Sequence, residues 1–222
     1  EHSDFGSSVA KAMRQWCREH RVSVVVDEGY EPGALDFTPT LSKVRDTKPD
    51  VVYMVSYLMD ASLIMRQARA QGITPKLFAG GACGFVLPEF IVNAGEATEN
   101  VVTAALWAPS VGYPGASEFA ETYRARYGTY PPYHAAESYA CVYVAEDVLL
   151  RAASTDPERL QVALADTDLL TAFGPIRFEA FGKYKNQNRI NTLVLQILNG
   201  QHEVVWPPEL ATAGYVFPDP LW

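Results

Sequence analysis

The chain has 222 residues, of which 48% are hydrophobic and 20% are charged, so it is long enough to bury one good core or two modest ones. Its formal net charge of -8 and its scattered lysines and arginines argue against nucleic acid and anionic membrane surfaces as partners. No stretch approaches the roughly 20 apolar residues that a membrane-spanning helix needs, so we expect no membrane insertion.

The first hundred or so residues alternate between predicted helices and strands. Helices are expected at residues 7–20, 38–46, 60–72 and 85–94, and strands at residues 22–26, 51–55, 76–79 and 101–107. This alternation predicts an α/β fold with a parallel sheet and right-handed crossovers. The first helix has no strand before it, which suggests that the sequence is a fragment that lacks its own beginning.

One β-α-β unit stands out between residues 51 and 84. Residues 51–55 form an apolar run without polar alternation, which is typical of a central parallel strand that is covered on both faces. Asp60 is placed to act as the N-cap of the following helix, and Gly72 to end it. Ligands of open α/β sheets collect at the carboxyl ends of the strands, so residues 57–60 and 80–85 are the first places to look for a site.

The character of the sequence changes after Trp107. Residues 108–115 hold two prolines and two glycines and are predicted to be a hinge. Three helices are then expected at residues 117–127, 133–153 and 157–165, followed by strands at residues 174–178, 192–198 and 203–206. Asn199 and Gly200 predict a hairpin turn between the last two strands. We expect the sheet that these helices cover, and hence part of their packing, to lie outside this sequence.

The search for catalytic and cofactor motifs gives no positive result. The four histidines lie in unrelated contexts, and the sequence has no HExxH, GxSxG, GxxxxGK[ST] or GxGxxG motif. We therefore expect no enzyme activity, no cofactor and no metal site. The GGACG turn at residues 80–84 has two interpretations, an anion cradle of backbone N-H groups or a tight turn that needs free φ angles, and the sequence does not separate them. Cys83 in this turn has no histidine near it in the sequence to activate it as a nucleophile.

Several motifs, taken in order, resemble one known family. They are DFG before a helix, GALDFTPTLSKVRDTKPDVV, SYLMDA, NAGEATENV, YPGASEFAETYRARYG, FGPIRF and NGQHEVVWP. Together they are similar to the type I periplasmic solute-binding proteins of the branched-chain amino acid ABC transporter group, the Leu/Ile/Val-binding-protein-like family. The resemblance covers nearly the whole chain.

The resemblance implies a fold of two Rossmann-like parallel-sheet lobes joined by a hinge. Residues 1–107 and 189–222 would form most of the second, C-terminal lobe. Residues 108–188 would form the hinge and the helical portion of the first lobe, whose sheet is missing from this chain. The expected structure is therefore one nearly complete lobe plus part of the other.

The resemblance also implies a function. Such a protein is a periplasmic or extracytoplasmic receptor that binds a small-molecule ligand in a cleft between its lobes and delivers it to the permease subunits of an ABC transporter. The alternative is a ligand-sensing domain of a regulator or receptor with the same fold. A DNA-binding or transmembrane segment in the full-length gene would favour the alternative.

The candidate site residues follow from the same resemblance. Similar proteins place an aromatic residue before the first glycine and a tyrosine after the third strand, here Phe5 and Tyr57, and both would face the cleft. Amino acid binders commonly use a carboxylate in the loop after the next strand to pair the α-ammonium. That loop has Ala82 and Cys83 instead, which favours an amide or aromatic acid over an α-amino acid unless another carboxylate compensates. Asp60 and Glu137 are the carboxylates that could compensate, and Trp107 also has a purely structural interpretation. The full set of candidates is Phe5, Tyr57, Asp60, Ala82, Cys83, Phe85, Trp107, Tyr133, His134 and Glu137.

Overall fold

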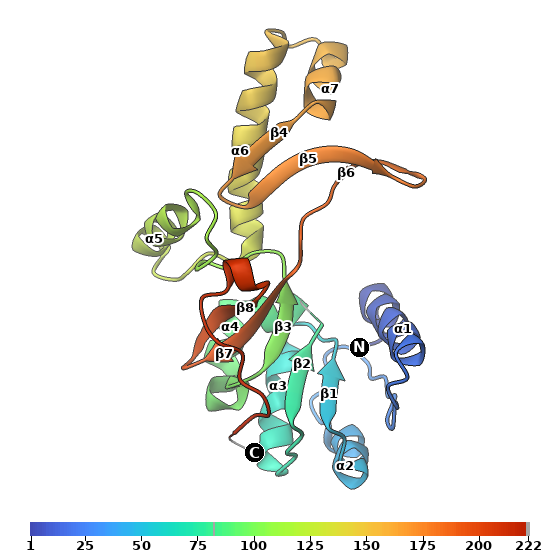
Figure 1. Cartoon of the computed structure of the whole chain (residues 1–222). Coiled ribbons are helices and arrows are strands. Elements are labelled where there is room, and N and C mark those ends of the chain that lie inside the picture. The colour runs from blue at the N-terminus through green and yellow to red at the C-terminus, as the bar shows by residue number, and fades with distance from the viewer. Residues whose placement is uncertain (82, 221–222) are drawn as a thin grey trace. The chain divides into compact units, whose positions relative to one another are not determined.

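The computed structural model describes residues 1–81 and 83–220, which divide into two compact units (Figure 1). The first unit comprises Glu1–Ala105, Val194–Trp206 and Ala213–Trp222, and the second comprises Leu106–Leu193 and Pro207–Thr212. The assignment of these units to the two lobes of a binding protein stays a prediction.

The first unit is built on a five-stranded sheet with the strand order β1-β2-β3-β7-β8. The strands are β1 (Val51–Met54), β2 (Leu77–Gly80), β3 (Val102–Ala105), β7 (Leu193–Leu198) and β8 (Gln201–Trp206). The first three are parallel, whereas β7 and β8 form an antiparallel hairpin. The predicted turn of this hairpin is confirmed, since Asn199 and Gly200 both have positive φ angles, 53° and 71°. The predicted α/β fold with a parallel sheet is likewise confirmed.

Three helices cover one face of this sheet and enclose its core. They are α2 (Thr38–Thr47), α3 (Leu58–Ala70) and α4 (Pro88–Ala94), with short 3-10 turns at Cys83–Val86 and Gly95–Thr98. The apolar stripe of α3 is fully buried, as its helical spacing predicts, and packs with Phe78 of β2 and Phe90 of α4. Apolar side chains at this spacing lie on one face of a helix, and burying that face against the sheet stabilises the helix.

The start of α3 differs from the prediction. The N-cap is Tyr57, so the expectation that Asp60 caps this helix is wrong. Asp60 lies in the first turn of the helix and is buried, and its two carboxylate oxygens accept from the Gly33 backbone N at 3.2 and 3.1 Å. An acidic side chain in the first turn also interacts favourably with the helix dipole. Asp60 therefore fastens a distant loop to α3.

The edge of the sheet at β1 also differs from the prediction. β1 pairs with β2 alone among the described residues, and Val51 is exposed, so β1 is not a strand covered on both faces. Residues 22–26, predicted as a strand, adopt no regular secondary structure. A strand exists only through pairing with a neighbour, and the described part of the chain places no strand beside them. The helix before them, α1 (Asp4–Glu19), is capped by Ser3, whose side chain accepts from the Gly6 N.

The second unit combines helices with a small antiparallel sheet. Its helices are α5 (Ala116–Tyr127), α6 (Tyr133–Ala152) and α7 (Pro157–Ala165), and its strands are β4 (Asp168–Thr171), β5 (Gly174–Phe181) and β6 (Tyr184–Asn188) in the order β4-β5-β6. The three helices lie where the sequence predicts them, and several apolar side chains of α6 are exposed, among them Val142, Leu149 and Leu150. β4 and β6 were not predicted, because β4 is short and the YKNQN sequence of β6 has no apolar alternation.

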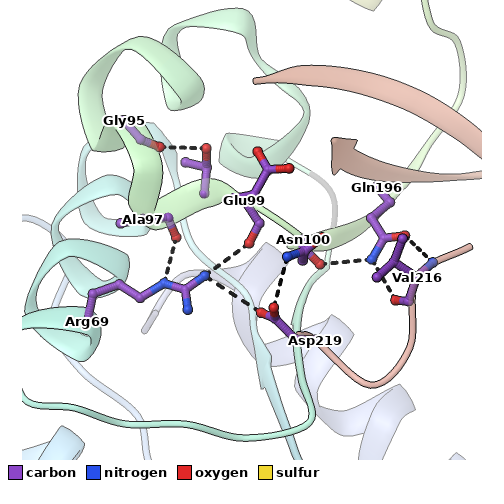
Figure 2. Close-up of polar contacts among 9 residues, drawn as sticks. Arg69, Gly95, Ala97, Glu99, Asn100, Gln196, Val216 and Asp219 are labelled. Atoms are coloured by element: carbon purple, nitrogen blue, oxygen red, sulfur yellow. Dashed lines mark hydrogen bonds and ion pairs between the residues drawn. The ribbon is translucent and has the colours of Figure 1, made fainter. Parts of the chain in front are cut away.

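A buried polar network fastens the C-terminal tail to the first unit (Figure 2). Asn100 Nδ2 donates to Asp219 Oδ1 at 2.8 Å, and Arg69 Nη2 lies 3.8 Å from Asp219 Oδ2. Arg69 also donates to the backbone oxygens of Ala97 and Glu99, at 3.2 and 3.0 Å. Burial lowers the pKa of Arg69 to about 10, while the charges of Asp219 and Glu99 oppose that shift. The guanidinium is thus held among polar partners within the unit.

The same network continues into the sheet. The fully buried Gln196 of β7 donates through Nε2 to the Asn100 oxygen at 3.1 Å and to the Val216 oxygen at 2.9 Å. Its Oε1 accepts from the Val216 N at 2.9 Å, as Figure 2 shows. The side-chain amide therefore pairs with the tail as another strand would. A buried amide that makes all of these bonds avoids the desolvation cost of an unpaired one.

Replacing Asp219 by asparagine tests this network. The substitution removes the carboxylate that faces Arg69, so we expect it to lower the free energy of unfolding by about 2–3 kcal/mol. Asp50→Asn is the matched control, because Asp50 pairs with Lys76 at 2.7 Å on the surface and such pairs contribute about 0–1 kcal/mol. Urea unfolding of both variants measures the difference, and equal losses would show that the buried pair does not stabilise the tail.

A second prediction concerns His202 on β8, whose Nε2 lies 2.9 Å from the Phe85 oxygen. Burial lowers the pKa of His202, and the hydrogen bond to Phe85 opposes that shift in part. As the pH falls below about 6.5, the unfolded state binds the proton first, so stability should decrease with acidity. His202→Gln should flatten this decrease in thermal unfolding between about pH 7 and 5. An unchanged pH profile in His202→Gln would contradict the assignment.

Candidate functional site

The carboxyl ends of β1 and β2 lie together at one edge of the first unit's sheet, because the two strands are parallel and pair Met54 with Gly80. The loops that follow them are bonded to each other. Gly81 N donates to the Met54 oxygen at 2.7 Å, and Gly84 N donates to the Ser56 oxygen at 3.2 Å. This edge is the position at which open α/β sheets bind ligands.

The glycines of this edge are required by close packing. A Cβ atom on Gly84 would lie 2.5 Å from the backbone N of Leu58, and one on Gly80 would overlap the Phe85 ring. Neither these two nor Gly81 has a positive φ, whereas Cys83 does, at 57°. The free-φ interpretation of the glycines is therefore wrong. Since the N-H groups of Gly81 and Gly84 are used between the loops, they are also not available as an anion cradle.

Two aromatic side chains predicted to bind the ligand meet at this edge. Phe5 comes from the first turn of α1 and Tyr57 from the N-cap of α3, and their ring centroids are 6.2 Å apart with planes inclined at 40°. Phe5 is 37% exposed and Tyr57 is 47% exposed. Large aromatic side chains that remain this accessible next to each other offer apolar surface to a solute.

The remaining predicted residues of the first unit have other environments. Cys83 is half-buried, and burial raises the pKa of its thiol, which favours the unreactive protonated form. Phe85 is completely buried and packs edge-on against Phe90 at 5.2 Å, so it belongs to the core. Asp60 is held by Gly33 as described above. Ala82 lies outside the described residues.

Four polar residues near this edge were not among the predicted site residues: Glu1, Ser3, Tyr30 and Ser56. Tyr30 donates to the Ser56 Oγ at 2.6 Å. Burial raises the pKa of Tyr30, and the charges of Asp60 and Glu1 add to the shift. Glu1 donates from its amino nitrogen to the Val55 oxygen at 2.9 Å, and its Oε1 accepts from the Ser3 Oγ at 2.5 Å. Ser3 as a helix cap could have drawn attention to Glu1, but no periodicity or motif marks Tyr30.

The other predicted residues belong to the second unit. Trp107 is 2% exposed, donates through Nε1 to the Ala172 oxygen at 2.8 Å and contacts Phe119 edge-on. Its environment matches the structural interpretation. Tyr133 and His134 open α6 with their rings stacked at 3.8 Å, and Glu137 is exposed one turn further along the same helix. The structure thus brings Phe5 and Tyr57 together in the first unit, with Cys83 in the loop after β2, and Tyr133, His134 and Glu137 lie on α6 of the second unit.

Residues 1–81 and 83–220 contain neither a metal-binding cluster nor a membrane-spanning helix. No group of three or more histidine, cysteine, aspartate or glutamate side chains in this part of the chain is arranged to hold a metal ion. None of its helices has both the length and the apolar character required to cross a membrane.

The family model for periplasmic binding proteins matches residues 1–200. Among curated relatives, the Leu/Ile/Val-binding protein homolog 8 of Brucella melitensis is 26% identical over 219 residues, which cover 96% of this chain and 54% of the relative. The chain therefore spans about half the length of the curated relatives it matches.

Solved structures give the same result. The leucine binding protein LivK from Thermotoga maritima is 29% identical, with a TM-score of 0.67 over 79% of this chain and 49% of that one. The substrate binding protein LivJ from Streptococcus pneumoniae, solved with isoleucine, is 26% identical, with a TM-score of 0.78 over 97% of this chain and 57% of that one. These relatives are substrate-binding proteins of transporters and not enzymes. By the match over residues 1–200 and the shared type I fold, this chain belongs to the periplasmic binding protein family, in the group related to branched-chain amino acid ABC transporters.

Proposed function

We propose that the chain is part of an extracytoplasmic receptor that binds a small amino acid-like, amide or aromatic acid ligand and delivers it to the permease subunits of an ABC transporter. The observation that carries this proposal is the exposed pair of Phe5 and Tyr57 at the carboxyl edge of β1 and β2. Membership of a solute-binding family supports a ligand-binding role for this pair, because this edge is where such a fold binds a small molecule.

The two rings account for apolar recognition. Burial of apolar area contributes roughly 25 cal/mol per Å², so a solute that covers both rings gains affinity without any new charge. The relatives LivJ, solved with isoleucine, and LivK, named for leucine, support a ligand of amino acid size. The N-H groups of Gly81 and Gly84 are engaged in holding the two loops together, so these two groups are not available to orient the ligand.

The charge of the site limits the ligand further. The loop after β2 carries no carboxylate, since Gly81, Ala82, Cys83 and Gly84 are all uncharged residues. Asp60 is already bonded to Gly33, and the buried Glu1 carboxylate accepts from Ser3 Oγ. Glu137 is exposed to water, where its attraction for an ammonium group is weak. These environments support an amide or aromatic acid over an α-amino acid.

A matched pair of solutes tests the charge argument. L-Leucine and 4-methylpentanoate differ only in the α-ammonium group, and we expect the second to bind at least as tightly as the first. In a thermal-shift screen that also includes benzamide and benzoate, a bound solute at 100 times its Kd should stabilise the protein by about 2.7 kcal/mol. Tighter binding of leucine by tenfold or more, about 1.4 kcal/mol, would show that a carboxylate of the protein pairs with the ammonium.

Tyr57→Ala tests the aromatic pair. Tyr57 is exposed and supports little of the core, so the melting temperature without ligand should barely change, while affinity for the best solute of the screen should fall by about 2 kcal/mol. Tyr184→Ala removes a more exposed tyrosine from β6 and should leave affinity unchanged. Calorimetric titration measures both variants. Retained affinity together with a much lower melting temperature would identify Tyr57 as a core residue instead.

A further inference from the structure

The turn between β7 and β8 carries an asparagine followed directly by a glycine. Asn199 and Gly200 are both exposed to solvent, and both have the positive φ angles of the central residues of a tight hairpin turn. In water, the backbone nitrogen that follows an asparagine can attack the side-chain Cγ of that asparagine. Glycine has no Cβ atom to shield its nitrogen, so this turn has the least steric protection against the attack.

The reaction is a substitution at the Asn199 side chain. The Gly200 nitrogen gives up its proton and forms a bond to Asn199 Cγ, while the bond from Cγ to Nδ2 breaks and the amide nitrogen leaves with that proton as ammonia. Water then opens the cyclic imide and leaves aspartate or isoaspartate at residue 199. Water is the only co-reactant, and nothing is oxidised or reduced.

The Glu99 carboxylate is bonded to the group that would have to react. Its Oε1 accepts from the Asn199 N at 2.7 Å, and its Oε2 accepts from the Gly200 N at 3.1 Å. Loss of the Gly200 proton would therefore place a negative charge 3.1 Å from a carboxylate oxygen. Two like charges about 3 Å apart slow such a step by about tenfold even at the dielectric constant of water.

The backbone around Glu99 is itself held in place. Glu99 follows the 3-10 turn Gly95–Thr98 and is half-buried, and its backbone oxygen accepts from Arg69 Nη2 at 3.0 Å. The next residue, Asn100, donates from its backbone N to the Ile197 oxygen at 2.8 Å. The carboxylate is thus directed at the turn from a segment that is bonded both to α3 and to β7.

We propose that Asn199 is a site of spontaneous deamidation and that the Glu99 carboxylate suppresses the reaction in the folded protein. The bond from Glu99 keeps the Gly200 nitrogen protonated, so the amide of Asn199 persists while the turn is capped. Deamidation would place a second carboxylate beside Glu99, and isoaspartate would lengthen the main chain of a turn that pairs Leu198 with Gln201. The modified chain therefore has a loosened β7-β8 hairpin.

The experiment measures the deamidation rate of the full chain in mildly alkaline buffer, by peptide mass spectrometry and enzymatic detection of isoaspartate. Glu99→Gln keeps the size of the side chain and removes its charge, so we expect Asn199 to be converted about tenfold faster than in the unaltered chain. Glu96→Gln is the matched control, because it removes an exposed carboxylate from the preceding 3-10 turn and should leave the rate unchanged. The rate in concentrated urea gives the limit without any protection.

A second variant separates the effect of Glu99 from that of folding in general. Ile64→Val removes one methyl group from the core of the same unit, which weakens the unit but leaves Glu99 in place. We expect this variant to convert Asn199 at the rate of the unaltered chain. Acceleration in Ile64→Val equal to that in Glu99→Gln would show that opening of the unit sets the rate, and would overturn the proposal. An unchanged or slower rate in Glu99→Gln, or equal rates for the unaltered chain in buffer and in urea, would also overturn it.

Discussion

The parallel pairing of β1 and β2 is the constraint on which the rest of the first unit depends. It places two strand ends at one edge, and the bonds from Gly81 to Met54 and from Gly84 to Ser56 lock the loops that leave them. The short approach of Gly84 to the start of α3 then fixes where that helix begins, and therefore where Tyr57 projects. The buried stripe of α3 holds this arrangement against the sheet.

Burial decides what each residue near that edge can do. Phe85 and Asp60 lie within a few residues of the site in sequence, yet one fills the core and the other fastens a loop through Gly33. Phe5 and Tyr57 remain accessible because each stands at a helix start, where the chain has just left the interior. The large side chains that this edge exposes are consequently aromatic.

Polar interactions in the unit serve mainly to attach segments that are distant in sequence. Gln196 and Asn100 hold the tail residues 216 and 219, and the Glu99 carboxylate accepts from the backbone N of Asn199 and Gly200 in the β7-β8 turn. The buried bonds of Gln196 and Asn100 contribute modest net stability but cost much when broken, since a partner is left without water. They hold the C-terminal segment against the rest of the first unit.

The sequence by itself determined the alternation of helices and strands, the hairpin turn at Asn199 and Gly200, the apolar stripe of α3 and the family, because these depend on local periodicity, turn chemistry and ordered motifs. Only the tertiary structure decided that Asp60 bonds to Gly33, that Phe85 is core, that Tyr30 reaches Ser56 and that residues 22–26 stay unpaired. Each of these depends on a partner far away in the chain. Local composition favours a strand at residues 22–26, but a strand forms only where a second backbone supplies its hydrogen bonds.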